Sequence, residues 1–513
     1  MEEKKVKGYG NLLEDKTGLL KHREWRGLGD TLFDFGFWMK NRMAWGLIRA
    51  LRREAFKKGE DRYRWTVTYR ILPHYYDMQC SNMRGPALRA ARANQFTLSL
   101  GFATGLALFL GCDERFFPGN ERNKKVIICD NLIPSIIASG FPDYTIKQIQ
   151  GMPQYVPSLV NQQSGIHYID VSESYGLPAD VCPIPSVEAG IAIDDDYPRI
   201  GICSITTNMP CDGSIMTTTI QDRRIGLPTH VLNVPLRHTR EDVQEYAVAE
   251  IKECIAFLEE QTGTKCNYEK MKEACEIANQ QSRLKIEKWE MNMTDTPPHT
   301  GASVWNYRIM TYATSLGNPI ALKNDEKVNK ILRKAMGKKR KYPKVSRHRA
   351  VIWNTPANMY CHFGNWILDC WGVEVVCDMI DHQSTQIIDT SSIDSMLYGI
   401  AKAVQGSTMR VHTKGGYEVI MDDLWVQVEK YRADMIIMFD QISCKGVDGI
   451  RGLFEEEARK RHIHMMWIDQ DLLDPRTISR RDMREQANKY METVMGEKPV
   501  DPTLVDFDDS LSW

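Results

Sequence analysis

Three of the thirteen cysteines in this chain lie in turns rather than in apolar runs, and thiols in such places can bind metals. Cys211 lies in TNMPCDG shortly after a predicted strand, and Cys444 lies in SCKG directly after the strand MIIMF. Cys182 lies in ADVCP, just before a predicted helix. A proline or glycine close to each cysteine favours a turn of the backbone around a bulky inorganic group. Thiolates are soft ligands that suit zinc and iron–sulfur clusters.

The spacing of these cysteines does not by itself identify a metal. The chain has no CxxC pair, which argues against a zinc knuckle or a ferredoxin-type motif. Cys203 competes with Cys211 because both lie in one loop region, but Cys203 falls within a predicted strand and Cys211 is preferred. Other cysteines, such as Cys254 and Cys377, lie in apolar runs and are expected to be small buried residues.

The elements that must position these turns alternate between strands and helices. The pattern predicts strands at 125–129, 198–204, 230–234, 350–353, 373–378, 434–439 and 463–468. It predicts helices at 241–261, 268–292, 359–371, 393–404, 424–431, 449–461 and 480–495. Such alternation is typical of parallel sheets with helices on both faces. Reactive groups in these sheets gather beyond the carboxyl ends of the strands, where two of the three cysteines lie.

We therefore expect an α/β protein with two Rossmann- or flavodoxin-like parallel-sheet domains and added helices. The expected boundaries are a mainly helical N-terminal extension at 1–120, a first α/β domain with long helices at 121–340 and a second at 341–513. A basic segment that contains a proline, 337–349, is interpreted as the linker. The extension is rich in arginine and aromatic residues, which suits either a solvated helix face or a partner-docking face.

Composition excludes several classes of partner. Lys+Arg 66 against Asp+Glu 67 gives a formal charge of −1, so a nucleic-acid partner is not expected. The longest strongly apolar run, 98–111, is shorter than the roughly 20 residues of a membrane span and predicts a buried helix. The start of the chain resembles no export signal, so we expect a cytoplasmic protein without a membrane partner.

Acid–base residues are harder to assign from the sequence. His362 follows the strand VIWN at the expected end of the sheet, and histidine is the usual proton carrier near neutral pH. The alternative is that His362 caps a helix. Lys445 either offsets the charge of the neighbouring thiolate or is simply solvated. The side chains of DLLDPR are expected to fix a turn: Asp471, Asp474 and Arg476.

An ordered set of short motifs resembles the 2-hydroxyacyl-CoA dehydratase and benzoyl-CoA reductase family, in particular the 2-hydroxyglutaryl-CoA dehydratase-like subunits. The resemblance runs from about Val126 to the end of the last helix. No single motif is specific, but their order is. The motifs are ICDNLIP (128–134), ASGFP (138–142), DVC (180–182), IC to Cys211 (202–211), LNVP (232–235), TGTK (262–265), SCK (443–445) and DQDLLDPR (469–476).

This resemblance implies that Cys182, Cys211 and Cys444 ligate one 4Fe–4S cluster in an anaerobic (R)-2-hydroxyacyl-CoA dehydratase, a hydro-lyase. In such an enzyme one electron from the cluster reduces the thioester carbonyl, and the resulting ketyl radical anion expels the neighbouring hydroxyl. The substrate is a coenzyme A thioester. The implied partners are a homologous second subunit, in a heterodimer or larger assembly, and an ATP-dependent iron–sulfur activator protein.

Two alternatives remain open from the sequence. The chain could be a subunit of a benzoyl-CoA-type aromatic ring reductase, an acyl-CoA oxidoreductase, because both reactions begin with electron transfer to an acyl-CoA. It could also be a non-catalytic electron-relay subunit of such a complex, with the substrate bound to the partner.

Overall fold

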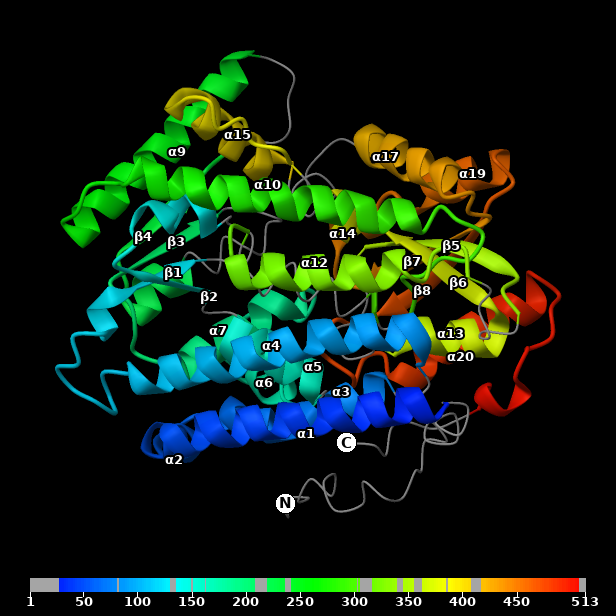
Figure 1. The fold of residues 1–513 in the computed structure, drawn as a ribbon, viewed down its shortest axis with the longest axis horizontal. Helices are drawn as coiled ribbons and strands as arrows, with labels where there is room; N and C mark the ends of the chain where they lie inside the picture. Colours follow the sequence, from blue (N-terminus) through cyan, green and yellow to red (C-terminus); the bar gives the residue numbers. More distant parts are fainter. Residues whose placement is uncertain are drawn as a thin grey trace.

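Two four-stranded parallel sheets lie side by side in the computed structural model and are enclosed by helices (Figure 1). The structure describes residues 27–506 except 81–82, 130–134, 149–150, 162, 208–218, 236–240, 302, 305–315, 339–344, 355–361, 384–385 and 407–416. The predicted fold class, α/β with two parallel sheets and a helical N-terminal region, is confirmed.

The first sheet has the strand order β2-β1-β3-β4 and every neighbouring pair is parallel. β1 and β3 are buried along their whole length, as expected of central strands covered on both faces. β2 and β4 form the edges and are only partly buried. The strands are β1 (Val126–Cys129), β2 (Thr145–Gln148), β3 (Cys203–Thr207) and β4 (Thr229–Leu232).

The second sheet has the order β6-β5-β7-β8, again entirely parallel. β7 and β8 pair without a register shift from Met435 opposite His464 to Gln441 opposite Gln470, so their carboxyl ends are level. The loops after both strands therefore meet at one edge. The strands are β5 (His348–Trp353), β6 (Val373–Asp378), β7 (Met435–Gln441) and β8 (His464–Gln470).

Helices from distant parts of the chain cover the sheets. Cysteines and aliphatic residues of β1 and β3 share one apolar cluster with α9, α10 and α15. In Figure 1 the second sheet lies between α17 and α19 above and α13 and α20 below. These helices are α9 (Glu241–Thr262), α10 (Tyr268–Met291), α13 (Phe363–Trp371), α15 (Ile393–Gln405), α17 (Tyr417–Lys430), α19 (Arg451–Lys460) and α20 (Arg480–Thr493).

The N-terminal helices form part of the main core. The apolar cluster of the second sheet extends from Ala55 to Leu504 and includes residues of α2, α3 and α4. α4 packs between α1 and α12, as the stacked helices of Figure 1 show. The other helices are α1 (Leu28–Leu51), α2 (Arg53–Arg62), α3 (Leu72–Gln79), α4 (Gly85–Gly111), α5 (Val156–Val160), α6 (Ile166–Ser174), α7 (Pro183–Ile193), α12 (Pro319–Arg333), α14 (Met379–Gln383) and α18 (Lys445–Asp448).

α4 contains the apolar run predicted to be a buried helix. It is long and apolar enough to cross a membrane, yet 67% of its most apolar window is buried inside the fold. Its polar side chains also find partners there, since Ser99 accepts a hydrogen bond from the Trp45 indole. The buried-helix prediction is therefore confirmed. Among the described residues, α4 is the one helix that meets the length and hydropathy of a membrane span.

Contacts cross both predicted domain boundaries. Asn279 of α10 exchanges two hydrogen bonds of 2.7 Å with the backbone of Ile388. Asn365 of α13 donates a hydrogen bond of 2.8 Å to the carbonyl of Gln79 at the end of α3. The boundaries near residues 120 and 340 stay a prediction, but the segments they separate are tied together by buried polar contacts.

A histidine fastens the start of the second sheet to the C-terminal segment. His348 Nδ1 lies 2.6 Å from Asp434 Oδ2, and its Nε2 lies 2.9 Å from Glu497 Oε1. The hydrogen bond with Asp434 is the main cause that raises the pKa of His348. Burial opposes ionisation of both carboxylates, but the hydrogen bonds and charges around each one together outweigh it and lower its pKa. The hydrogen bond with His348 is the largest of these lowering contributions for both carboxylates.

We expect His348→Gln to lose about 2 kcal/mol of stability near pH 6, the usual size for hydrogen bonds to charged groups. The raised pKa of His348 stabilises the fold fully below about pH 6.5, and this contribution disappears as pH rises through the folded-state pKa. The lowered pKa values of the carboxylates contribute above about pH 4.5 and are lost on acidification. Thermal unfolding of both proteins at several pH values should therefore show the largest difference between about pH 4.5 and 6.5. A difference that grew above pH 8 would contradict this interpretation.

Candidate functional site

Two of the three candidate thiols lie at the first turn of a helix. Cys444 follows β7 and is the N-cap residue of α18, with its amide 2.7 Å from the carbonyl of Gln441. Cys182 is the N-cap residue of α7, which begins with Pro183. Both cysteines are partly exposed at the margin of the main core. A thiolate at a helix N-terminus is stabilised by the orphan amides and the helix dipole.

An ion pair places these two turns next to each other. Lys445 Nζ lies 2.7 Å from Asp180 Oδ2, although the two residues are 265 positions apart in the chain. The hydrogen bond from Lys445 lowers the pKa of Asp180. Because Asp180 is two residues before Cys182 and Lys445 directly follows Cys444, the contact brings both thiol-bearing turns to one edge of the second sheet. Such an exposed pair adds little stability, so its value here is the proximity that it establishes.

The Cys444 turn is also fixed from the other side. Gln441 accepts a hydrogen bond of 2.7 Å from the amide of Leu472 through its side chain, and the amide of Ile442 donates to Gln470. The side-chain amide of Gln441 donates to Ser443 at 3.0 Å. The loops after β7 and β8 are thus held together by hydrogen bonds at the carboxyl edge of the sheet.

The DLLDPR turn after β8 is fixed by its own side chains, as predicted. Asp471 accepts hydrogen bonds from the amides of Leu473 and Asp474 at 3.0 and 2.8 Å. Asp474 accepts hydrogen bonds from the backbone amide and the guanidinium of Arg476. Another nitrogen of the same guanidinium donates a hydrogen bond of 2.7 Å to Asp170 of α6. Burial raises the pKa of Asp471. The predicted structural role of Asp471, Asp474 and Arg476 is therefore confirmed.

α6 and α7 connect the DLLDPR turn to the turn that contains Cys182. The two helices pack closely, and Gly190 of α7 faces the backbone of Tyr168 in α6 so directly that an added Cβ would lie 2.7 Å from its Cα. Contacts therefore run from the Cys444 turn through the DLLDPR turn to α6 and α7. They return to Cys444 through the ion pair beside Cys182, and both thiols are positioned by this ring of contacts.

A carboxyl pair lies beside the Cys444 turn and was missed by the sequence analysis: Asp440 is buried and Asp448 is partly buried. Burial and the neighbouring Asp448 raise the pKa of Asp440, whereas Arg451, 3.5 Å away, lowers it. Two close carboxyl groups can share one proton and exchange it near neutral pH. The available signal was an aspartate that ends a wholly apolar strand, in MIIMFD, followed eight residues later by a second one.

His362 is buried at the start of α13, in the connection that follows β5. Its carbonyl accepts hydrogen bonds from the amides of Asn365 and Trp366, but its side chain makes no capping hydrogen bond to the helix. The capping alternative therefore does not describe this side chain. Its role in proton transfer stays a prediction.

Cys211 lies outside the described residues, and within those residues no three histidine, cysteine, aspartate or glutamate side chains are grouped to hold a metal ion. Its competitor Cys203 is fully buried in β3, and burial raises its pKa to about 12. A buried strand thiol that resists ionisation is a poor ligand, which favours Cys211. The described donors, two partly exposed thiols on adjacent turns, suit an iron–sulfur group.

One comparison with known proteins gives a match. The family model described as 2-hydroxyglutaryl-CoA dehydratase, D-component, matches residues 151–494, about two thirds of the chain. The matched range contains Cys182, Cys211, Cys444 and His362, and it begins after the motifs at 128–134 and 138–142. No curated protein matches the chain significantly.

Proposed function

This chain belongs to the 2-hydroxyglutaryl-CoA dehydratase D-component family, and we propose that it is the iron–sulfur subunit of an anaerobic (R)-2-hydroxyacyl-CoA dehydratase. In this proposal Cys182, Cys211 and Cys444 hold one 4Fe–4S cluster. A homologous second subunit completes the active site, and an ATP-dependent iron–sulfur activator supplies the first electron. The family supports a dehydratase component and a coenzyme A thioester as substrate.

One observation carries the cluster assignment. The Asp180–Lys445 ion pair brings together two partly exposed cysteine turns that are far apart in sequence, whereas most other described cysteines of the chain are buried. Buried apolar cysteines need no neighbours of this kind, whereas cluster ligands must converge from several loops. When bound, such a cluster supplies one-electron chemistry to an acyl-CoA thioester.

The chain's own residues have supporting tasks in this proposal. The ion pair and the DLLDPR turn hold the thiols in place, so that their geometry is set before any ligand binds. His362 is the candidate that removes the β-proton of the substrate, because an imidazole can exchange a proton near neutral pH.

The test uses the anaerobic complex of this chain with its second subunit. We expect about four iron atoms and four sulfide ions per copy of this chain, and a brown preparation. After one activation with ATP, 2-hydroxyglutaryl-CoA should be dehydrated over many turnovers without further ATP. Benzoyl-CoA should not be reduced.

Each alternative gives a different result in the same experiment. A colourless preparation without iron and sulfide would reject the cluster. ATP consumption that matches every turnover, with reduction of benzoyl-CoA, would identify a ring reductase. A cluster spectrum that acyl-CoA leaves unchanged would identify an electron-relay subunit.

A further inference from the structure

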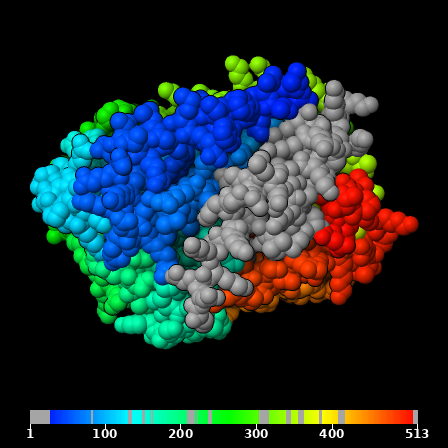
Figure 2. Space-filling view, turned by 90° about the horizontal axis from the view of Figure 1, so that it is seen from below, coloured from blue at the N-terminus to red at the C-terminus, as the bar shows by residue number. Residues whose placement is uncertain are grey.

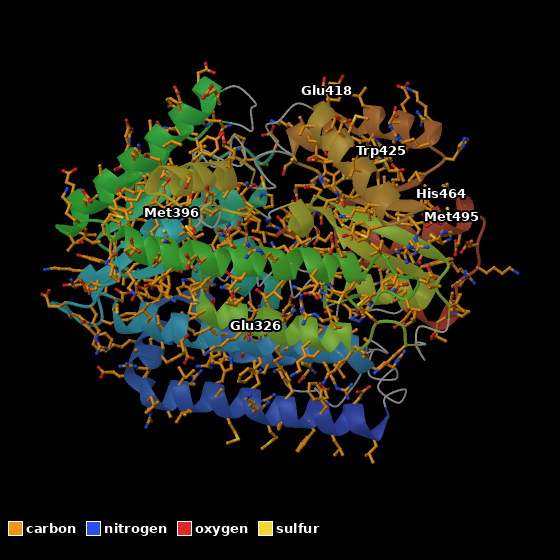
Figure 3. All side chains as sticks on the ribbon, turned by 45° about the horizontal axis from the view of Figure 1, so that its top comes forward. Glu326, Met396, Glu418, Trp425, His464 and Met495 are labelled. Carbon is orange, nitrogen blue, oxygen red and sulfur yellow. The ribbon has the colours of Figure 1, made fainter. Side chains whose placement is uncertain are left out.

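The outer side of α1 is the most apolar exposed surface among the described helices. Eight of its large apolar side chains are at least 37% exposed, although α1 packs along α4 on its other side. Figure 1 places α1 at the outer edge of the molecule, and Figure 2 shows α1 and α2 running across that face. The sticks along α1 in Figure 3 project away from the body. These residues are Leu28, Leu32, Phe33, Phe35, Met39, Met43, Leu47 and Leu51.

Among the exposed positions of α1, one set follows a coiled-coil spacing and combines three of these large apolar residues with three glycines and one alanine. Seven positions, spaced alternately by three and four residues, form a line along the outer face, which we call the α1 seam. All seven are exposed and none carries a charge. An uncharged 3–4 repeat over about three heptads is typical of a helix that packs against a second helix. The α1 seam consists of Gly29, Leu32, Gly36, Met39, Met43, Gly46 and Ala50.

The glycines of the α1 seam are not required for packing against any described part of this chain. Apart from the local helix backbone, no described atom lies within 4 Å of a Cβ added at Gly29, Gly36 or Gly46. A glycine inside a helix costs about 0.5–1 kcal/mol relative to alanine. Without a Cβ, however, a helix face allows the backbone of another helix to approach closely. This property is useful against a protein helix and adds nothing to burial in a lipid surface.

The charges of α1 are divided between its two sides. Its acidic residues, Asp30 and Asp34, turn inward and pair with Arg89 and Arg92 of α4 at 2.8 and 2.6 Å. The outer side therefore presents no carboxylate of α1.

Cations border the α1 seam on both sides. Lys40 lies on one side with its Nζ 4.1 Å from the centre of the Phe96 ring, and Arg42 lies on the other, 4.6 Å from that of Trp38. In helix pairs the residues that border the seam select the partner. An antiparallel pair of two α1 helices would set Lys40 of one copy against Lys40 of the other, and Arg42 against Arg42, which is repulsive.

We propose that the α1 seam docks a helix of another protein whose apolar heptad positions are bordered by Asp or Glu. The apolar 3–4 repeat requires a helical partner, the glycines permit close approach, and the bordering cations select carboxylates over a second copy. The contact line is about 32 Å long, which is one face of a three-heptad helix. This proposal does not depend on the cluster or on the dehydratase reaction.

The probe is a synthetic peptide of about three heptads with Leu at every seam position and Glu at every bordering position. The same peptide can pair with α1 in a parallel or an antiparallel orientation. A matched peptide carries Lys at the bordering positions. Fluorescence anisotropy with the full chain should show that the Glu peptide binds at least about tenfold more tightly than the Lys peptide, with the difference shrinking at high salt.

Two variants separate docking from folding. Met39→Glu/Met43→Glu changes only exposed positions and should weaken binding of the Glu peptide by about tenfold or more without changing the thermal midpoint. Gly36→Leu should raise the thermal midpoint or leave it unchanged, because leucine has a higher helix propensity than glycine and no described atom lies near this position. The added side chain should nevertheless weaken peptide binding. The control Ile393→Glu/Val426→Glu replaces exposed apolar residues elsewhere, 49% and 58% exposed, and should leave binding unchanged.

Five results would overturn the proposal. One is equal binding of the two peptides, and another is binding that survives Met39→Glu/Met43→Glu. A dimer of this chain that the same variant dissociates would show a second copy as the occupant. If the chain sediments with vesicles of phosphatidylcholine and phosphatidylglycerol and Met39→Glu/Met43→Glu abolishes this, the occupant of the seam is a lipid surface. Peptide binding that appears only after residues 1–26 are removed would assign the seam to the chain's own N-terminal segment, which also contradicts the proposal.

Discussion

Replacing Cys182 or Cys444 with serine is expected to reduce the iron and sulfide of the anaerobic protein to less than about a tenth and to abolish dehydration. Serine is nearly isosteric, but its hydroxyl is a hard ligand that does not ionise near neutral pH. Both cysteines are partly exposed, so the change creates no cavity and the fold should persist. Iron and sulfide analysis, the visible spectrum and circular dichroism measure these effects together.

Cys266→Ser is the matched control, because Cys266 is also partly exposed but lies between α9 and α10. It should retain the full iron content. Cys211→Ser and Cys203→Ser decide which of these residues is the third ligand. The first should lose iron, whereas the second should lose stability, because it puts a hydroxyl into the buried strand β3. Normal iron in Cys211→Ser together with low iron in a folded Cys203→Ser would reverse the assignment.

The central strands could be predicted from the sequence because parallel strands covered on both faces are continuous apolar runs. β6 has the predicted bounds, Val373–Asp378, and each of its residues is buried. β2 was missed because three of the four residues in its sequence, TIKQ, are polar, which suits an edge strand. β3 begins five residues later than predicted. Gly201, with a φ of 105°, packs against Ile128 just before the strand, and the run of pairing residues starts at Cys203.

The candidate site could be predicted only in parts. Turn residues marked Cys182 and Cys444 individually, and DLLDPR indicated a self-bonded turn, because these are local properties. Their convergence is not local. It depends on an ion pair between Asp180 and Lys445 and on the packing of α6 against α7, which no spacing along the chain encodes. Similarly, the raised pKa of Asp440 arises from burial and a neighbour on the next turn, and only the fold provides both.

Alanine at Gly190 is expected to destabilise the protein by about 3 kcal/mol, at the upper end of the cost of overpacking. The added methyl group would lie 2.7 Å from Tyr168 Cα and closer still to its carbonyl oxygen. These are backbone atoms in the first turn of α6, so no side chain can rotate away, and the helices must separate. Because α7 begins beside Cys182, their separation should also displace that thiol and lower the iron content.

Gly101→Ala tests whether this effect comes from close packing rather than from alanine itself. Gly101 lies inside α4, is exposed, and has no described atom within 4 Å of an added Cβ apart from the local helix backbone. That substitution should stabilise the protein by about 0.5–1 kcal/mol through helix propensity alone. Anaerobic thermal unfolding of the two variants should therefore shift the midpoint in opposite directions. A Gly190→Ala protein with wild-type stability would mean that α6 and α7 do not hold the Cys182 turn by close packing. The ion pair between Asp180 and Lys445 would then be the contact to test next, because it also joins this turn to the Cys444 turn.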